Sequence, residues 1–293
     1  MPDQPGNRLL CENVNVVQLI DDVSSALGFE DAQPLRQGGQ KLVLKGTLSG
    51  APAVAKIVVL SPGPNGGITL QRAHREVELL SAVDSNRVVK VLTDAVEIGD
   101  PPTAVCWAEE YLDGADLSDH LNAAWDESAV WTLLEDLAEA LSACHDLDVV
   151  HRDLSPANVR RMPDGHFVLM DPGLARHLEK TALTGGFQPG TAGWRSPEHV
   201  AGGNPMPASD IFALGILAFY ALTCQFPIDP NGDAAAYDRA LAEQQAPRIS
   251  TLLPGLSDEL AEVIDTCLSR QQARRYLDGA ELKAALDAAR AAR

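Results

Sequence analysis

The spacing of apolar residues changes character partway along the chain. Short apolar runs in L-V-L-K-G-T-L and A-V-A-K-I-V-V-L (42–60) predict two strands joined by a turn at S-G-A-P. A helical pattern follows in I-T-L-Q-R-A-H-R-E-V-E-L-L (68–80), and V-V-K-V-L and A-V-C-W-A-E-E-Y-L again predict strands. An earlier helical run ends at Gly28, where glycine favours a helix stop. This half therefore predicts a small sheet with one helix, preceded by a helical extension.

After Gly114 the pattern becomes mostly helical. Apolar residues at helical spacing predict helices at about 127–147, 208–223, 233–245, 257–268 and 278–291. Short apolar runs predict strands around 149–150, 158–161 and 166–170. The change of pattern near 112–116 predicts a boundary, giving an extension over 1–34 and two parts over 35–112 and 113–293.

Net charge and cysteine usage indicate which partners and which cellular compartment to expect. The formal net charge of -18 repels nucleic acid and anionic membranes, so neither is expected as a partner. The five cysteines show no metal-ligand spacing, which fits a reducing, cytoplasmic compartment. The N-terminus lacks the pattern of a signal peptide. The longest apolar run (211–224) is too short to span a membrane. No appended sensor or membrane anchor is expected.

Two short polar motifs carry the candidate chemistry. In H-R-D-L-S-P-A-N (151–158), Asp153 can accept or orient a hydroxyl proton, and the side-chain oxygen of Asn158 can ligate a metal from the same loop. In H-F-V-L-M-D-P-G, Asp171 follows a predicted strand, where a second carboxylate could hold Mg²⁺ against phosphate oxygens. Each residue alone is a weak signal, because such residues usually cap helices or turns, but their order together is specific.

These motifs resemble those of eukaryotic-type serine/threonine protein kinases, in particular the bacterial members. H-R-D-L-S-P-A-N resembles the catalytic loop and D-P-G the metal-binding triplet. G-T-A-G-W-R-S-P-E, S-D-I-F-A-L-G and C-L-S-R-Q-Q-A-R-R-Y resemble later segments of the same family, whose pattern would pair Arg275 with Glu198. The resemblance covers roughly residues 35–290. It implies an α+β, two-lobed protein-kinase-like fold with a small β-rich N-lobe and a larger helical C-lobe.

The resemblance also implies roles in the first lobe. Lys56 matches the strand lysine that holds the α- and β-phosphates of ATP, and Glu76 matches the helix glutamate that pairs with it. The segment from Glu110 to Leu112 would be the hinge whose backbone receives adenine. A lone strand lysine usually lies at the surface, so the order of these residues before the hinge carries the assignment.

The implied set of functional residues then covers catalysis, nucleotide binding and metal binding. The resemblance implies catalytic roles for Lys56, Glu76, Asp153 and Asn158, nucleotide contacts from Gly38, Gly39, Lys41, Val43, Lys56, Glu110, Leu112 and Asp116, and Mg²⁺ ligands at Asn158 and Asp171. Asp116 would contact the ribose, and its alternative role is to cap the short helix that follows.

Two departures from the family pattern stand out. In R-Q-G-G-Q-K-L-V (36–43) only Gly38 matches the glycine-rich loop, since Arg36 and Lys41 replace the outer glycines. Ser155 stands where serine/threonine kinases carry lysine, which removes a positive charge beside the γ-phosphate. Lys41 could supply that charge instead, or it could point to solvent as strand lysines usually do.

Three functions remain open on this evidence. The first is a protein kinase that transfers the γ-phosphoryl of ATP, with Mg²⁺, to Ser or Thr hydroxyls of a protein substrate, with a regulatory protein partner as a further expected contact. The second is a pseudokinase that binds nucleotide or serves as a scaffold, which the altered glycine loop favours mildly. The third is a small-molecule phosphotransferase of the aminoglycoside-kinase type.

Thr181 and Thr184 are further predicted as acceptors of an activating phosphate that Arg152 would bind.

Overall fold

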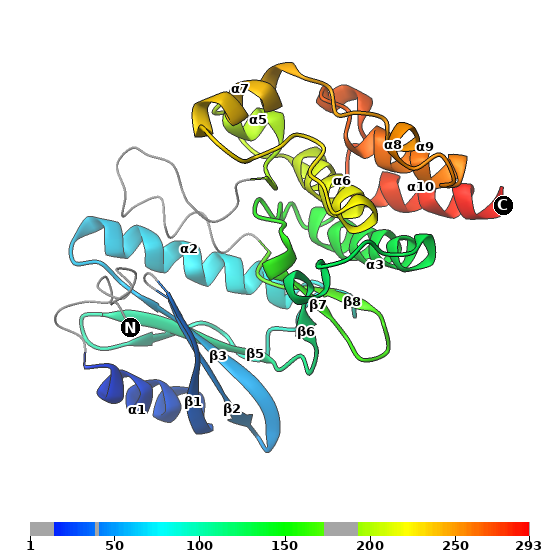
Figure 1. The fold of residues 1–293 in the computed structure, drawn as a ribbon. Helices are drawn as coiled ribbons and strands as arrows, with labels where there is room; N and C mark the ends of the chain where they lie inside the picture. The colour runs from blue at the N-terminus through cyan, green and yellow to red at the C-terminus, as the bar shows by residue number, and fades with distance from the viewer. Residues whose placement is uncertain (1–14, 39–40, 173–192, 293) are drawn as a thin grey trace, which may run out of the picture. The chain divides into compact units, whose positions relative to one another are not determined.

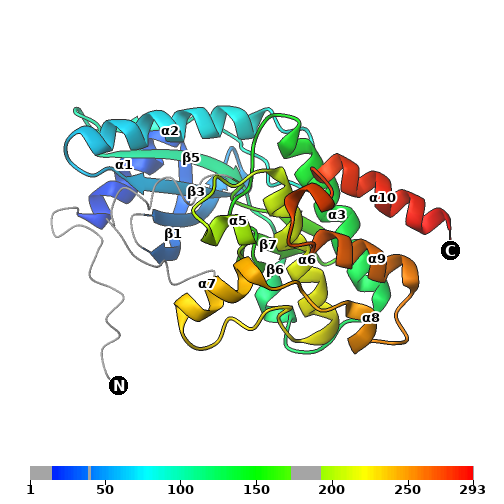
Figure 2. The same cartoon turned by 90° about the horizontal axis from the view of Figure 1, so that it is seen from above.

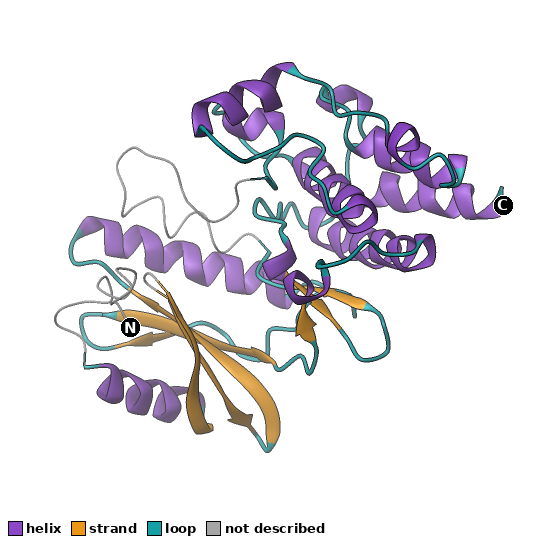
Figure 3. Cartoon of the chain, in the orientation of Figure 1, coloured by secondary structure: helices purple, strands orange, loops and turns teal. Residues whose placement is uncertain are grey.

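The computed structural model describes residues 15–38, 41–172 and 193–292 of the 293-residue chain. The chain divides into two compact units, which are described separately. Of the described residues, the first contains 15–38, 41–82 and Val89–Leu112, and the second contains Val83–Val88, 113–172 and 193–292. The first unit is built on a sheet and the second is largely helical (Figure 3). This confirms the predicted α+β class.

The first unit is a five-stranded antiparallel sheet with two helices. The strand order is β1-β2-β3-β5-β4, with β1 at Phe29–Gly38, β2 at Lys41–Leu48, β3 at Ala51–Val59, β4 at Val96–Ile98 and β5 at Ala104–Glu110. Helix α1 (Val16–Leu27) and helix α2 (Pro64–Ser81) lie on opposite sides of this sheet (Figure 1). Alternation along β3 decides which side chains face each helix.

Helix α1 belongs to the same hydrophobic core as the sheet. Its Leu19 and Val23 are buried in one cluster with the odd-numbered apolar residues of β3. The Asn15 side chain accepts from two backbone N–H groups at its start, and Gly28 ends it at φ 65. The first strand starts directly afterwards at Phe29, so helix and strand are joined without a linker.

The predicted strand at 88–92 did not form as a ladder. The structure has isolated bridges there, between Val88 and Leu169 and between Val91 and Glu109. Lys90 instead exchanges hydrogen bonds with Glu110, donating its N–H to the carboxylate and accepting the backbone N–H on its carbonyl. These local hydrogen bonds satisfy the backbone N–H and carbonyl of Lys90. The short edge strand of the sheet is β4, which lies further along the chain.

The second unit is built around a buried helix. Its main helices are α3 (Glu127–His145), α6 (Pro207–Thr223), α7 (Ala234–Glu243), α9 (Asp258–Cys267) and α10 (Gly279–Ala291), with short α5 (Pro197–Val200), α8 (Ile249–Leu252), η1 (Leu117–His120), η2 (Pro156–Asn158) and η3 (Gln272–Arg274). A small sheet, β6-β7-β8, comprises Ala115–Asp116, Val159–Arg161 and Phe167–Leu169. Helix α6 is buried along most of its length, as its all-round apolar sequence predicts.

The predicted helices of this unit agree with the structure to within about two residues. The strand predicted at 149–150 is wrong. The Val149 N–H donates to the Cys144 carbonyl in the turn that ends α3, so its hydrogen bond is local and no ladder forms.

Helices α3 and α10 lie side by side (Figure 2). The first residue of α10, Gly279, has no room for a side chain. A Cβ on Gly279 would overlap the backbone nitrogen of Ser142 and lie 2.6 Å from the Leu141 carbonyl carbon.

We expect Gly279→Ala to lower the free energy of unfolding by about 3 kcal/mol, the upper end for overpacking, because backbone atoms yield little. Urea denaturation measures this. The matched control is Gly67→Ala in α2, where a Cβ meets nothing within 4 Å and about 0.5–1 kcal/mol of stabilisation is expected. Equal midpoints for the two variants would contradict the prediction.

Candidate active site

The lysine predicted to hold phosphate lies on the face of β3 opposite the α1 core. Ala55 and Ile57 are fully buried against α1, so strand alternation turns Lys56 to the other face. Its cross-strand neighbours are Val43 on β2 and Trp107 on β5. The structure thus places two of the predicted nucleotide-binding residues, Lys56 and Val43, directly opposite one another.

Lys56 forms an ion pair that the sequence did not predict. Its Nζ lies 2.5 Å from Oε2 of Glu109, near the end of β5. The other oxygen of Glu109 accepts a hydrogen bond of 2.8 Å from Nε1 of the buried Trp107. Glu76, the predicted partner of Lys56, lies on helix α2 of the same unit and is partly buried.

The predicted hinge continues directly from this strand. The Glu110 N–H donates to the Lys90 carbonyl, and the Glu110 carboxylate accepts the Lys90 N–H, both at 2.9 Å. Leu112 is buried. This paired arrangement fixes the backbone at which adenine binding is predicted.

The glycine-rich segment is described only at its ends. Gly38 is the last residue of β1 and Lys41 the first residue of β2, and the two pair across the hairpin. Gly39 lies outside the described residues.

The predicted catalytic loop lies in the second unit and is held by hydrogen bonds within it. Nδ2 of Asn158 donates to the Asp153 carbonyl at 2.8 Å, and the Asn158 N–H donates to the Ser155 carbonyl at 3.0 Å. Because the Asn158 nitrogen is engaged in this way, its side-chain oxygen remains the atom suited to a metal ion. Ser155 is buried and opens the short helix η2.

Two contacts join this loop to the segment that carries Asp171. The Met170 N–H donates to the Asn158 carbonyl at 2.8 Å, and the ring nitrogen Nε2 of His151 lies 2.9 Å from the Met170 carbonyl. Asp171 follows with a φ of 52, in the left-handed region that few non-glycine residues adopt. The structure therefore links the loop that carries Asp153 and Asn158 to the segment that carries Asp171 through hydrogen bonds to their backbones.

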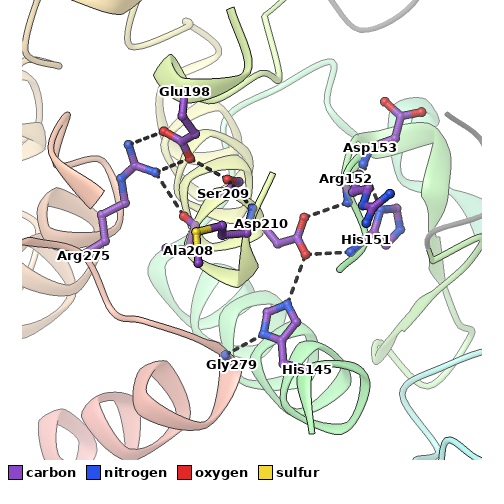
Figure 4. A network of polar contacts seen from close by, with 11 residues as sticks. His145, His151, Arg152, Asp153, Glu198, Ala208, Ser209, Asp210, Arg275 and Gly279 are labelled. Carbon is purple, nitrogen blue, oxygen red and sulfur yellow. Dashed lines mark hydrogen bonds and ion pairs between the residues drawn. The ribbon is translucent and has the colours of Figure 1, made fainter. Parts of the chain in front are cut away.

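A buried aspartate in the first turn of α6 anchors the catalytic loop (Figure 4). The carboxylate of Asp210 is 2 % exposed, and it accepts the backbone N–H groups of His151 at 2.7 Å and Arg152 at 2.9 Å. Arg152 has a φ of 69, so the loop turns sharply at the point that Asp210 holds.

His145, at the end of α3, extends this anchor to α10. Its Nε2 lies 3.1 Å from the Asp210 carboxylate, and its Nδ1 accepts the Gly279 N–H at 3.0 Å (Figure 4). Since a backbone N–H can only donate, Nδ1 accepts and the ring hydrogen lies on Nε2, directed at Asp210. The sequence flagged S-D-I-F-A-L-G as a family segment but gave Asp210 and His145 no role. A carboxylate opening an otherwise apolar helix was the available signal.

Asp116 has a partner in its own unit. Its carboxylate lies 2.8 Å from Nη1 of Arg160 on the neighbouring strand β7. It occupies the N-cap position of η1 but makes no capping hydrogen bond, so the capping alternative for its side chain is wrong.

The predicted pairing of Arg275 with Glu198 is confirmed. Nη1 and Nη2 of Arg275 contact the two carboxylate oxygens at 2.9 and 3.1 Å (Figure 4). Its remaining N–H groups donate to three backbone carbonyls, so all five donors of the guanidinium are engaged. Ser209 adds a 2.6 Å hydrogen bond to the same carboxylate.

The Glu198 pair makes stability depend on pH. Burial alone would raise the pKa of Glu198, but the hydrogen bonds and charge of Arg275 outweigh it and lower the pKa from 4.5 to about 2. A folded-state pKa below the unfolded one stabilises the fold above pH 4.5, and this contribution is lost as pH falls from 4.5 towards 2.

We expect roughly 2–3 kcal/mol of unfolding free energy to disappear over this window. Denaturation at several pH values measures it. Glu198→Gln should lose this part of the pH dependence of the unfolding free energy, and Glu243→Gln, at an exposed position, should keep it. Parallel profiles of unfolding free energy against pH for wild type and Glu198→Gln would contradict the assignment.

The predicted phosphate acceptors Thr181 and Thr184 lie outside the described residues. Among the residues that the structure does describe, no helix is long and apolar enough to cross a membrane.

The sheet unit carries a half-buried strand lysine paired with a carboxylate, and the helical unit carries an anchored Asp-Asn loop and a second aspartate, which are the features of the protein kinase class. The chain belongs to the protein kinase domain family, which it matches over residues 29–283. It is 32 % identical over 210 residues to the serine/threonine-protein kinase PknL of Mycobacterium tuberculosis, covering 70 % of this chain and 51 % of the relative. It is 29 % identical over 257 residues to a probable serine/threonine-protein kinase PknB of Lactococcus lactis, covering 84 % of this chain and 39 % of that relative.

Solved structures agree at the level of fold. The kinase domain of Mycobacterium tuberculosis PknI matches with a TM-score of 0.64 at 23 % identity, covering 90 % of this chain and 97 % of the domain. The chain spans about half the length of PknL and 39 % of the length of the Lactococcus lactis relative. The similarity therefore concerns the kinase domain.

Proposed function

We propose that the chain is an active protein kinase that transfers the γ-phosphoryl of ATP to Ser or Thr hydroxyls of protein substrates. The observation that carries this proposal is the bonded arrangement of the catalytic loop, in which Asn158 and His151 tie Asp153 to the segment bearing Asp171. The relatives named as serine/threonine-protein kinases support the acceptor class.

In this proposal each candidate residue has a separate task. Asp153 accepts or orients the proton of the acceptor hydroxyl. The side-chain oxygen of Asn158 and the carboxylate of Asp171 would hold Mg²⁺, which when bound neutralises charge on the phosphates. Lys56 holds phosphate oxygens, with Glu76 as its family partner, and Gly38, Gly39, Lys41 and Val43 contact the nucleotide. Glu110 and Leu112 would receive adenine and Asp116 the ribose, which would then share Asp116 with Arg160.

Compartment and partners follow from the same features. Among the described cysteines Cys106, Cys144 and Cys267 are buried free thiols, and burial raises the pKa of each to about 12. The exposed Cys224 is free as well, so none of these four described cysteines forms a disulfide, which supports a reducing, cytoplasmic setting. Control by a regulatory protein partner belongs to the proposal as well.

The experiment is phosphate transfer from γ-labelled ATP with Mg²⁺. The chain is incubated alone, with generic protein acceptors and with small-molecule alcohols, and phosphorylated residues are identified by mass spectrometry. Phosphoserine or phosphothreonine in protein is the expected product. Nucleotide binding without transfer to any acceptor would establish the pseudokinase instead, and transfer confined to small molecules would place the chain among small-molecule phosphotransferases.

A further inference from the structure

The charge of Glu109 sits where few carboxylates are found. Its side chain is 3 % exposed, at the end of a strand whose other residues are almost all buried. A buried carboxylate is costly unless it is paired and hydrogen-bonded. Here both of its oxygens are engaged, Oε2 by the Lys56 ammonium at 2.5 Å and Oε1 by Trp107 Nε1 at 2.8 Å.

Strand register explains how these three side chains meet. Lys56 pairs directly with Trp107 across β3 and β5, so the two side chains share a face of the sheet. Glu109 lies two residues beyond Trp107 and therefore on that same face, diagonal to Lys56. The arrangement depends on the sheet alone, and the position of helix α2 does not enter it.

We propose that Glu109 is a positioning residue for Lys56, a second carboxylate anchor that belongs to the sheet and adds to the family's anchor on the helix, Glu76. This rests on the proposed function insofar as Lys56 holds phosphate. An ammonium has three donors, so Lys56 can keep Glu109 while it contacts a phosphate oxygen. Trp107 prevents the carboxylate from turning away, because rotation would break a buried hydrogen bond. The consequence is that Lys56 keeps one carboxylate anchor on the sheet whatever the position of Glu76.

The first test needs no nucleotide. Glu109→Gln keeps the size of the side chain and an oxygen for Trp107 but removes the charge that holds Lys56. Acylation of Lys56 by an amine-reactive reagent, followed by mass spectrometry at one pH, should rise several-fold in this variant, because the amine has lost its contact with the buried carboxylate. Glu30→Gln, at an exposed position on the same sheet, is the control and should leave Lys56 labelling unchanged. Unchanged labelling in Glu109→Gln would overturn the proposal.

The second test uses stability. Lys56→Met leaves the buried Glu109 charge without its cation, so the midpoint of urea denaturation should fall. Adding Glu109→Gln should restore part of that loss, and adding Glu30→Gln should not. If Glu109→Gln gives no recovery over Lys56→Met, the ion pair does not determine the state of Glu109, and the proposal fails.

The third test separates positioning from general damage. Turnover and the KM for ATP are compared for Glu76→Gln, Glu109→Gln and the double variant. Two anchors of one lysine should each tolerate loss of the other, so the double variant should lose roughly tenfold more activity than the product of the single effects. Multiplicative effects would overturn the redundancy. A chain without any transfer activity would refute the proposed function, while the labelling and stability tests would still decide the role of Glu109.

Discussion

Asp153→Asn should lower phosphate transfer by about 10²–10⁴-fold, the usual contribution of a side chain that takes or orients a proton. Asparagine has nearly the same shape, but it cannot accept the hydroxyl proton. The hydrogen bonds that hold the loop use the Asp153 backbone, so the fold should be unaffected. Initial rates with γ-labelled ATP and a protein acceptor measure the effect, and thermal unfolding checks the fold.

Asp148→Asn provides the matched control for Asp153→Asn. It makes the same change of charge in the same unit, at an exposed residue in a left-handed turn conformation that asparagine also accepts. Its rate should equal that of wild type. A near-normal rate for Asp153→Asn would show that the chain does not use this residue as kinases do.

Asp210→Ala should remove roughly 3–5 kcal/mol of unfolding free energy and abolish transfer together. The substitution leaves the buried amides of His151 and Arg152 and the His145 ring without their acceptor, and each unsatisfied donor costs about 1–3 kcal/mol. Urea denaturation and transfer rates measure the two effects. Asp210→Asn, which keeps one acceptor oxygen, should fall between wild type and alanine.

Asp287→Ala tests whether any aspartate of this unit behaves in the same way. It lies on α10, largely exposed, 3.5 Å from Lys283. Such surface pairs contribute less than about 1 kcal/mol, so little change is expected. If Asp210→Ala were as mild as Asp287→Ala, the loop would be held by other contacts.

The sequence predicted what depends on local pattern. Helices of the second unit, the hairpin of β2 and β3, and the order of the Asp153, Asn158 and Asp171 motifs all follow from spacing along the chain, and the family pattern also predicted the distant Arg275–Glu198 pair. Strand character at 88–92 and 149–150 was misread, because short apolar runs do not show whether a partner strand is available.

The residues that sequence reading missed act across elements. Glu109 was read only as part of the strand A-V-C-W-A-E-E-Y-L, and its contact with Lys56 depends on the register between β3 and β5. Likewise, Asp210 and the loop that it anchors are 58 and 59 residues apart. Register and long-range docking arise from the packed fold, and a single sequence carries little trace of them.

The Asp210 anchor also bears on the order of events during folding. Its donors come from the end of α3 and from the catalytic loop, while the carboxylate arrives with α6, later in the chain. Contacts over such separations form only after the intervening chain has closed its loops. A nascent or partly folded chain can therefore hold its helices before its catalytic loop is fixed. Under the proposed function, catalytic competence would be among the last properties that the chain acquires, and phosphate transfer would wait until the fold is complete.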